Sequence, residues 1–240
     1  MTRFAVFILL LSALAGCVAL ARVEGEAHPR GPEGRRFHKY TLVFRGNGQN
    51  CILTLSSPKP DDMADRVHGS YRVNDGWDSP FGLFYDYRGH FWQGDFGSFD
   101  VVVCIVPRPS ASPPWKDMES LLKGIRLKSA EDNKVASGQR TRPTLTTLNG
   151  VSCVHQYVKR GADPKADWLY IFPIDENHAI ELSCKFVRNK IPGQPDKSDW
   201  RPRAEELARK ILATVKVHWV KTSPEKPPKD KGRSGEYGVG

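Results

Sequence analysis

The stretch SDWRPRAEELARKILATVKV, residues 198–217, carries the strongest structural signal in the chain. Apolar and small side chains recur along it at three- and four-residue spacing, which places one apolar stripe along a helix: Ala204, Leu207, Ala208, Ile211, Leu212 and Val215. Ser198 or Asp199 can cap its start, and acidic residues precede basic ones, an order that suits the helix dipole. The stretch therefore predicts a helix that closes the fold by packing on a sheet.

The rest of the second half is predicted to alternate strands with one earlier helix. PPWKDMESLLKGIRLKS (113–129) has apolar residues at helical spacing, with Ser112 as its cap and prolines in the first turn. Four runs rich in β-branched and aromatic residues follow, at 134–141, 150–160, 167–174 and 178–187. Helices at both ends of an antiparallel run predict an α+β class, with two main helices packed on antiparallel sheet.

The first half is predicted to be β-rich. HKYTLVFR (38–45) and NCILTLSS (50–57) flank GNGQ, whose glycines supply the positive φ angles of a tight reversal, so a hairpin is expected here. VVVCIV (101–106) has no polar alternation and is expected to be a strand covered on both faces.

The order of elements in the second half resembles the PsbP-like fold, in which two helices sandwich an antiparallel sheet. The matching stretches are PPWKDMESLLKGI, LNGVSCVHQYV, YIFPIDENHAIELSC and AEELARKILATVKV, within 112–218. The resemblance implies an accessory or binding protein, and some lipid-anchored immunity proteins that are paired with secreted toxins look similar.

The N-terminus has the form of an export signal: a short basic head, then an apolar run from Phe4 to Gly16 that is too short to span a bilayer. LAGC (14–17) resembles the bacterial lipobox, which implies cleavage before Cys17 and a lipid on its thiol. Val18, which is not an aspartate, then implies the periplasmic side of the outer membrane. The alternative is cleavage after ALA (19–21) by an ordinary signal peptidase.

These signals divide the chain into five predicted parts. A signal peptide (1–16) precedes a lipidated cysteine with a flexible tether (17–36), which is charged and poor in bulky apolar residues. A β-rich half (37–110) and an α/β sandwich half (111–220) follow, and a basic tail (221–240) is expected to be disordered.

Four cysteines remain after processing: Cys51, Cys104, Cys153 and Cys184. An even number in an exported protein favours disulfides, and the sequence does not choose among the three pairings. We favour Cys51–Cys104 and Cys153–Cys184, because each pair lies within one half. The alternative is four buried thiols.

Composition and motifs argue against several functions. The formal net charge of +9 suits anionic lipid, acidic polysaccharide or an acidic protein, and no motif of a nucleic-acid binder is present. The chain lacks G-x-S-x-G, H-E-x-x-H and C-x-x-C, so we expect no catalytic residues, no metal site and no cofactor.

Aromatic residues crowd the region 77–99. Because they do not share one strand face, some are expected at the surface, where aromatics near arginine are typical of protein interfaces and sugar-binding clefts. We expect a partner-binding surface of Trp77, Tyr85, Tyr87, Arg88 and Trp92. The alternative is that these rings fill the core.

Together these features predict a lipid-anchored periplasmic binding protein that is not an enzyme. The leading hypothesis is an immunity-type inhibitor that occludes a secreted toxin effector, so that its partners are the membrane, through the lipid, and a protein. The alternative is an envelope accessory lipoprotein that binds glycan or assists outer-membrane assembly.

Overall fold

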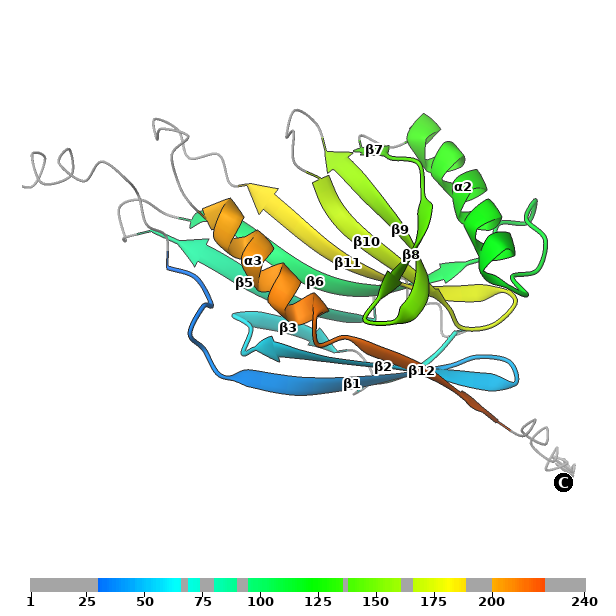
Figure 1. Ribbon diagram of the computed structural model, residues 1–240. Coiled ribbons are helices and arrows are strands. Elements are labelled where there is room, and N and C mark those ends of the chain that lie inside the picture. Colours follow the sequence, from blue (N-terminus) through cyan, green and yellow to red (C-terminus); the bar gives the residue numbers. More distant parts are fainter. Residues whose placement is uncertain are drawn as a thin grey trace, which may run out of the picture.

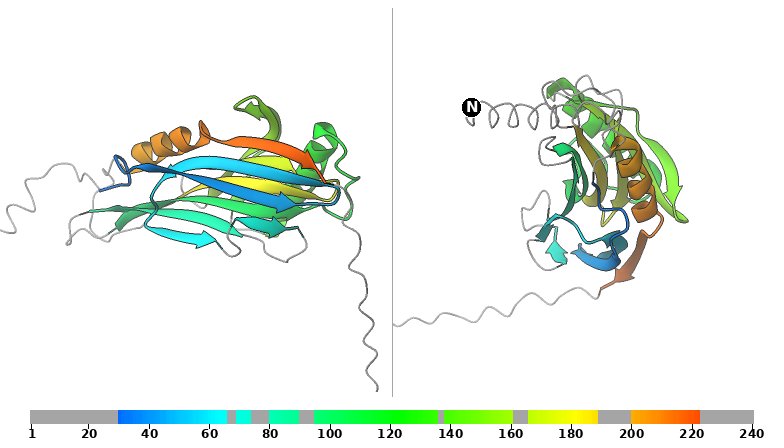
Figure 2. Two further views of the ribbon diagram at one scale, coloured as in Figure 1. Left: turned by 90° about the horizontal axis from the view of Figure 1, so that it is seen from below. Right: turned by 90° about the vertical axis from the view of Figure 1, so that its left-hand side faces the viewer.

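The computed structural model describes residues 30–65, 69–73, 80–89, 95–135, 138–160, 166–188 and 200–222. Within these residues the chain forms twelve strands and two helices. The strands make two sheets, of four and eight strands, that lie face to face (Figures 1 and 2). The architecture is a two-layer β-sandwich with helices added to it.

The smaller sheet has the order β12-β2-β1-β4. Strands β1 (Phe37–Arg45) and β2 (Gln49–Pro58) pair antiparallel, which confirms the predicted hairpin, and Gly48 has the positive φ of +80° that its turn requires. Strand β12 (Lys216–Lys221) pairs antiparallel with β2, and the short β4 (Ser70–Arg72) pairs parallel with β1.

The larger sheet is antiparallel throughout, in the order β3-β5-β6-β11-β10-β9-β7, with β8 also paired to β9. Its strands are β3 (Asp62–Asp65), β5 (Phe81–Arg88), β6 (Asp95–Pro107), β7 (Gly138–Arg140), β8 (Thr144–Leu148), β9 (Val151–Arg160), β10 (Ala166–Pro173) and β11 (His178–Arg188). A turn at Asn149-Gly150, where both residues have positive φ, joins β8 to β9.

Alternate residues of both sheets fill the space between the two layers. Leu42 and Leu53 point inward from the smaller sheet, and Val101, Val103 and Leu182 from the larger one; all five are fully or almost fully buried. The burial of each such side chain contributes about 1.5–3 kcal/mol. Because β6 pairs with β11 and β2 with β12, the two predicted halves share both sheets and one core.

Helix α3 (Trp200–Leu212) lies where the closing helix was predicted and buries the expected stripe, including Ala204, Leu207 and Ala208. It packs beside the core against β2, β6 and β11 (Figure 1). The helix ends five residues earlier than predicted. The residues that follow, around Val215, are rich in β-branched side chains, which favour a strand. They lead into β12, which pairs with the edge of β2.

Helix α2 (Met118–Val135) begins later than the sequence suggested. Asp117 caps it, while Ser112 is buried and accepts a hydrogen bond from the Trp115 indole nitrogen at 3.3 Å. The helix covers part of the outer face of the larger sheet, where a second apolar cluster forms: Val106, Trp115, Leu121, Leu122, Ile125, Val154, Ile171 and Ala179.

The expected α+β class is therefore wrong: the protein is mostly β, and two helices accompany a sandwich of strands. The expected disulfides are also wrong, because no disulfide joins Cys51, Cys104, Cys153 and Cys184 to one another.

Strand geometry explains why neither expected disulfide forms. Val103 and Ile105 point into the inter-sheet core, as Cys51 does, so the alternation along β6 turns Cys104 to the opposite face of the larger sheet. Cys153 and Cys184 lie on β9 and β11, which flank β10, and two inter-strand spacings amount to about 9.5 Å. A disulfide needs Cα atoms within about 6.8 Å.

The last residues of the predicted tether contact the folded domain. Arg30 forms a backbone bridge with Arg88, and the Arg35 guanidinium pairs with Asp61 at 2.9 Å. Glu33 pairs with Arg203 of α3, also at 2.9 Å. Twelve residues, 18–29, separate Cys17 from Arg30.

Candidate functional site

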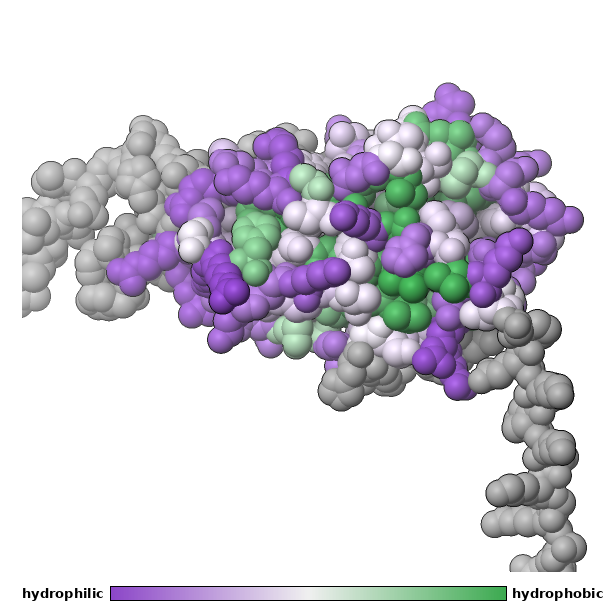
Figure 3. All heavy atoms as spheres, turned by 60° about the horizontal axis from the view of Figure 1, so that its bottom comes forward, coloured by the Kyte–Doolittle hydropathy of each residue, from purple (hydrophilic) through white to green (hydrophobic). Residues whose placement is uncertain are grey.

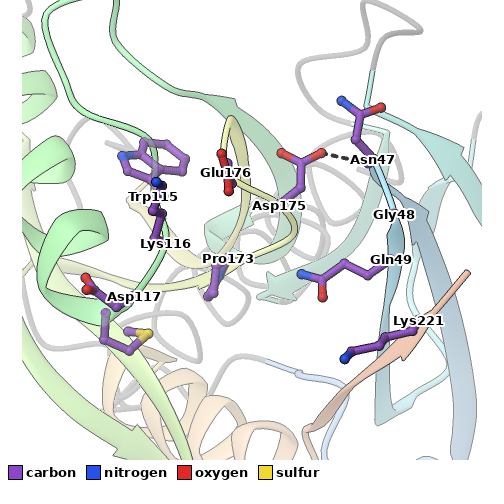
Figure 4. Close-up of a pocket in the computed structure, with 11 residues that line it drawn as sticks. Asn47, Gly48, Gln49, Trp115, Lys116, Asp117, Pro173, Asp175, Glu176 and Lys221 are labelled. Atoms are coloured by element: carbon purple, nitrogen blue, oxygen red, sulfur yellow. Dashed lines mark hydrogen bonds between the residues drawn. The ribbon is translucent and has the colours of Figure 1, made fainter. Parts of the chain in front are cut away.

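A cleft of about 570 Å³ lies where turns of the two sheets meet the start of α2 (Figure 4). In Figure 4, Gln49 and Lys221 extend into the cleft from the side of the smaller sheet, and Trp115, Lys116 and Asp117 line the opposite side. The full lining is Asn47, Gly48, Gln49, Trp115, Lys116, Asp117, Met118, Pro173, Asp175, Glu176 and Lys221.

The buried carboxylate of Asp175 organises this cleft. It lies in the β10–β11 turn, with its side chain 4% exposed. It accepts hydrogen bonds from the backbone nitrogens of Asn177 and His178, both at 2.8 Å, and from that of Asn47 at 3.0 Å. The Nδ1 atom of His178 lies 3.0 Å from the same carboxylate. One side chain thus ties the hairpin of the smaller sheet to a turn of the larger sheet.

Two further hydrogen bonds cross between the sheets beside Asp175. The Gln49 side-chain nitrogen donates to the carbonyl of Ile174 at 2.5 Å, and the Trp219 indole donates to the carbonyl of Pro173 at 2.7 Å. The residues of the cleft are therefore held by contacts between segments about 125 positions apart in the sequence, as well as by their own turns.

The α2 side of the cleft is held in the same way. The backbone nitrogen of Trp115 donates to the carbonyl of Glu176 at 2.8 Å, which attaches the approach to α2 to the β10–β11 turn. Asp117 accepts from the Ser120 backbone nitrogen at 2.7 Å, and the Ser120 hydroxyl accepts from the Asp117 backbone nitrogen at 3.1 Å. Hydrogen bonds that its carboxylate accepts from Ser120, first of all from the backbone nitrogen, lower the pKa of Asp117, which is therefore anionic at neutral pH.

The mouth of the cleft offers both donors and acceptors. Lys116 and Lys221 are exposed and cationic, Asp117 and Glu176 are exposed and anionic, and the amide of Asn47 adds both kinds of group. Pro173, Met118 and Trp115 supply apolar contact surface. Such a balanced lining suits a ligand rich in hydroxyl or amide groups better than a highly charged ligand.

The cleft lining contains no serine, threonine, cysteine or histidine, so it has no hydroxyl or thiol nucleophile paired with a histidine base. Among the described residues, no group of three or more His, Cys, Asp and Glu side chains could hold a metal ion. Neither described helix has the length and apolarity needed to cross a membrane.

A second hollow, of about 650 Å³, lies beside the start of β1 and is lined by His38, Tyr40 and residues 59–63. The carboxylate of Asp61 is already engaged there, by the Arg35 guanidinium at 2.9 Å and the Asp86 backbone nitrogen at 3.0 Å. We therefore regard the cleft at the sheet junction as the stronger candidate.

The aromatic surface expected from the sequence is placed differently by the structure. Tyr85 and Tyr87 are fully buried. Tyr85 stacks on Phe99 at 5.6 Å between ring centroids, and burial raises the pKa of both tyrosines. Arg88 is exposed and pairs with Asp86 at 2.7 Å. Trp77, Trp92 and the lipidation candidate Cys17 lie outside the described residues.

Sequence reasoning missed the cleft residues as a group. The sequence predicts a reversal at Gly46-Asn47-Gly48, and residues 175–177 separate two predicted strands; both segments are turns in the structure. Nothing in their local pattern indicates that the two turns meet. The available signal was chemical: a reversal that carries Asn or Asp has hydrogen-bonding groups beyond those its own turn needs.

Comparison with known proteins finds no matching family model and no matching curated protein. Among solved structures, the chain is similar to LpqN, described as involved in cell envelope biogenesis of Mycobacterium tuberculosis, with a TM-score of 0.40 and 13% identity, over 76% of this chain and 92% of that one. It is also similar to a protein from Bacteroides thetaiotaomicron, with a TM-score of 0.28 and 16% identity, over 73% of this chain and 47% of that one. At these TM-scores neither likeness assigns the chain to a family or to a function. Neither a lipobox nor a PsbP-like protein is among these findings.

Proposed function

We propose that this protein is a non-catalytic binding protein of the bacterial cell envelope and that its cleft holds a segment of an envelope glycan. The envelope location rests on the export signal and on LAGC, which ends at Cys17. The binding role rests on one observation: buried Asp175 fixes two turns that present amide, carboxylate and ammonium groups around one cleft.

Glycan chemistry fits this lining. Each sugar hydroxyl both donates and accepts hydrogen bonds, and the cleft mixes acceptors on Glu176 with donors on Lys221 and an amide on Asn47 that does both. The formal charges at the mouth balance, so the cleft suits a neutral or zwitterionic segment. The apolar surface of Pro173 and Met118 suits the C–H face of a sugar ring.

Asp117 and Glu176 are a pair of carboxylates, and such pairs also serve glycoside hydrolysis. Hydrolysis needs two carboxyl groups that are free to reach the sugar, one as the acid and the other as the nucleophile or base. Asp117 is instead occupied as a helix cap, and its hydrogen bonds lower its pKa. We therefore propose binding without cleavage.

Glycan binding displaces the immunity-type hypothesis as the leading proposal. That hypothesis depended on an exposed aromatic surface, and two of its five residues, Tyr85 and Tyr87, lie in the core. A toxin partner remains a prediction without a described surface to support it.

The proposal is tested with the chain from Val18 to Gly240, which retains every described contact. Isothermal titration with soluble glycan fragments released from a bacterial envelope should show saturable binding. Glu176→Ala and Lys221→Ala should each weaken it about tenfold, because each removes a charged hydrogen-bonding group. Glu131→Ala, an exposed change on α2, should leave the affinity unaltered.

Absence of binding to every fragment, or equal weakening by Glu131→Ala, would contradict the glycan proposal. Release of new reducing ends would contradict the absence of catalysis. The anchor is tested separately, by fatty-acid labelling of the full-length protein in cells. Cys17→Ser should abolish the labelling, and unchanged labelling would show that the lipid is not on Cys17.

A further inference from the structure

The outer face of the smaller sheet is a second surface with its own chemistry. Leu42, Leu53 and Val217 point into the core, so the alternate residues of the same strands point outward. We call this surface the β1/β2/β12 face. Its residues are Phe37, Lys39, Thr41, Val43, Arg45, Asn50, Ile52, Thr54, Lys216, His218 and Val220.

The centre of the β1/β2/β12 face is apolar. Val43 is in register with Ile52, and Val220, 45% exposed, lies on the neighbouring strand. Phe37, 40% exposed, adds a ring at the start of β1. Figure 3 views the molecule from this side and shows hydrophobic residues gathered between hydrophilic ones.

The charged residues on this face have one sign. None of the strands β1, β2, β4 and β12 contains an aspartate or a glutamate, although the chain has 27 of these residues. Lys39, Arg45 and Lys216 are exposed, and no ion pair between described residues involves any of the three. Their charges are therefore available to an external anion.

The outer face of the larger sheet carries charges of both signs. Asp86, Asp100, Asp167 and Glu181 alternate with inward-facing core residues and so lie on that outer face. Arg88 pairs with Asp86, Arg140 pairs with Glu181, and Lys185 is in register with Asp100. The strands of the β1/β2/β12 face instead carry cations without carboxylates, so an anionic plane would attract the molecule by this face.

The chain length also suits a membrane. From Cys17 to Arg30 there are 13 residue steps, which extend at most about 45 Å. A lipid on Cys17 would keep the domain within that distance of the bilayer surface, where lysine and arginine side chains are attracted to anionic headgroups.

We propose that the β1/β2/β12 face docks on anionic lipid headgroups, so that the anchored domain lies on the membrane with its smaller sheet toward the lipid. The basic rim contacts phosphate, and Phe37 and Val220 lie at the level of the interface. The inference rests on the proposed envelope location. It adds a second membrane contact and a fixed orientation, with the larger sheet turned away from the lipid.

The test uses the chain from Val18 to Gly240, which has neither the apolar leader nor the lipid, so that docking is measured apart from anchoring. Co-sedimentation with vesicles of phosphatidylethanolamine and phosphatidylglycerol should show binding that weakens as salt rises, and vesicles of phosphatidylcholine should bind at least tenfold less. Arg45→Glu with Lys216→Glu should lower the partition coefficient more than tenfold. Lys123→Glu with Arg126→Glu, an equal charge change on exposed positions of α2, should lower it less than threefold.

Equal binding to both kinds of vesicle, equal loss in the two double variants, or no binding at low salt would overturn the proposal. So would retention by a soluble polyanion such as polyglutamate without retention by vesicles. If Cys17 carries no lipid but the vesicles behave as expected, the anchor is wrong and the docking face stands. If labelling occurs but vesicle binding fails, the docking face is wrong and the anchor stands.

Discussion

At the scale of single residues, Asp175 matters most to the cleft. Its carboxylate accepts three backbone hydrogen bonds from two different turns, and one of these bonds, from Asn47, joins the two sheets. A short local pattern predicts a turn at this position, and the structure shows that the same side chain also serves a distant segment.

We expect Asp175→Ala to lower the free energy of unfolding by about 3 kcal/mol, because it removes the acceptor of three partly buried backbone hydrogen bonds. Urea denaturation measures the change. Glu176→Ala, at the exposed neighbouring position, should change stability little. A loss below about 1 kcal/mol in Asp175→Ala would show that the carboxylate does not hold the turns.

Asp100 is the residue whose ionisation should affect stability. Burial on β6 raises its pKa to about 6, with Asp167 and Asp86 acting in the same direction and Lys185 opposing. The folded chain therefore holds this proton more tightly than the unfolded chain, and stability is lost as the pH rises through about 6.

Asp100→Asn removes this ionisation. We expect the variant to exceed the wild type by about 1 kcal/mol at pH 8, after allowance for partial solvent screening, and to show no such gain at pH 3.5. Urea denaturation at the two pH values checks the sign. A gain that is the same at both pH values would assign the effect to packing and not to charge.

At the scale of elements, patterns within short stretches of sequence predict the hairpin and the helix whose contacts are mostly local. The β1–β2 hairpin follows from alternation and a glycine turn, and the apolar stripe of α3 from its spacing. Strand β8 was missed, because Thr144–Leu148 is mostly exposed and has no buried alternation. Strand β12 was read as the end of a helix, because its pairing with β2 depends on a segment more than 150 residues away.

Helix α3 packs on the larger sheet through a close contact between Trp200 and Gly97. A Cβ atom at Gly97 would lie 2.6 Å from the Trp200 ring and 2.7 Å from the carbonyl oxygen of Val187. We expect Gly97→Ala to cost about 2 kcal/mol of stability through overpacking.

Trp200→Phe in the Gly97→Ala background should recover part of that loss, because the smaller ring vacates the space of the new methyl group. Urea denaturation of the two single variants and the double variant gives the coupling free energy between Gly97 and Trp200. Additive effects would show that the helix does not depend on this contact.

At the scale of the whole molecule, the cysteines show what a sequence count leaves out. An even number in an exported chain favoured pairing, but pairing needs the right face and the right strand separation. Cys104 faces away from the inter-sheet core, and β10 separates Cys153 from Cys184. The strand register sets the face to which Cys104 points, and the strand order sets the distance between Cys153 and Cys184. Register and strand order both depend on the fold as a whole.

The chain from Val18 should accordingly contain four reduced thiols after purification in air. Thiol titration in denaturant measures this number. In the native protein Cys51 and Cys153 should react slowly, because burial raises the pKa of each thiol to about 12. A titre of two or none in denaturant would mean that disulfides form after all.

The whole molecule combines a cleft and a basic sheet face in one sandwich. Our central functional claim is that the cleft binds an envelope glycan. The most direct test maps the residues at which a glycan binds. Amide chemical shifts of ¹⁵N-labelled protein, from Val18 to Gly240, should be recorded during titration with soluble envelope glycan fragments. The account predicts saturable changes at Asn47, Gln49, Lys116, Glu176 and Lys221, with the β1/β2/β12 face unchanged. Changes confined to other surfaces, or none at millimolar ligand, would contradict it.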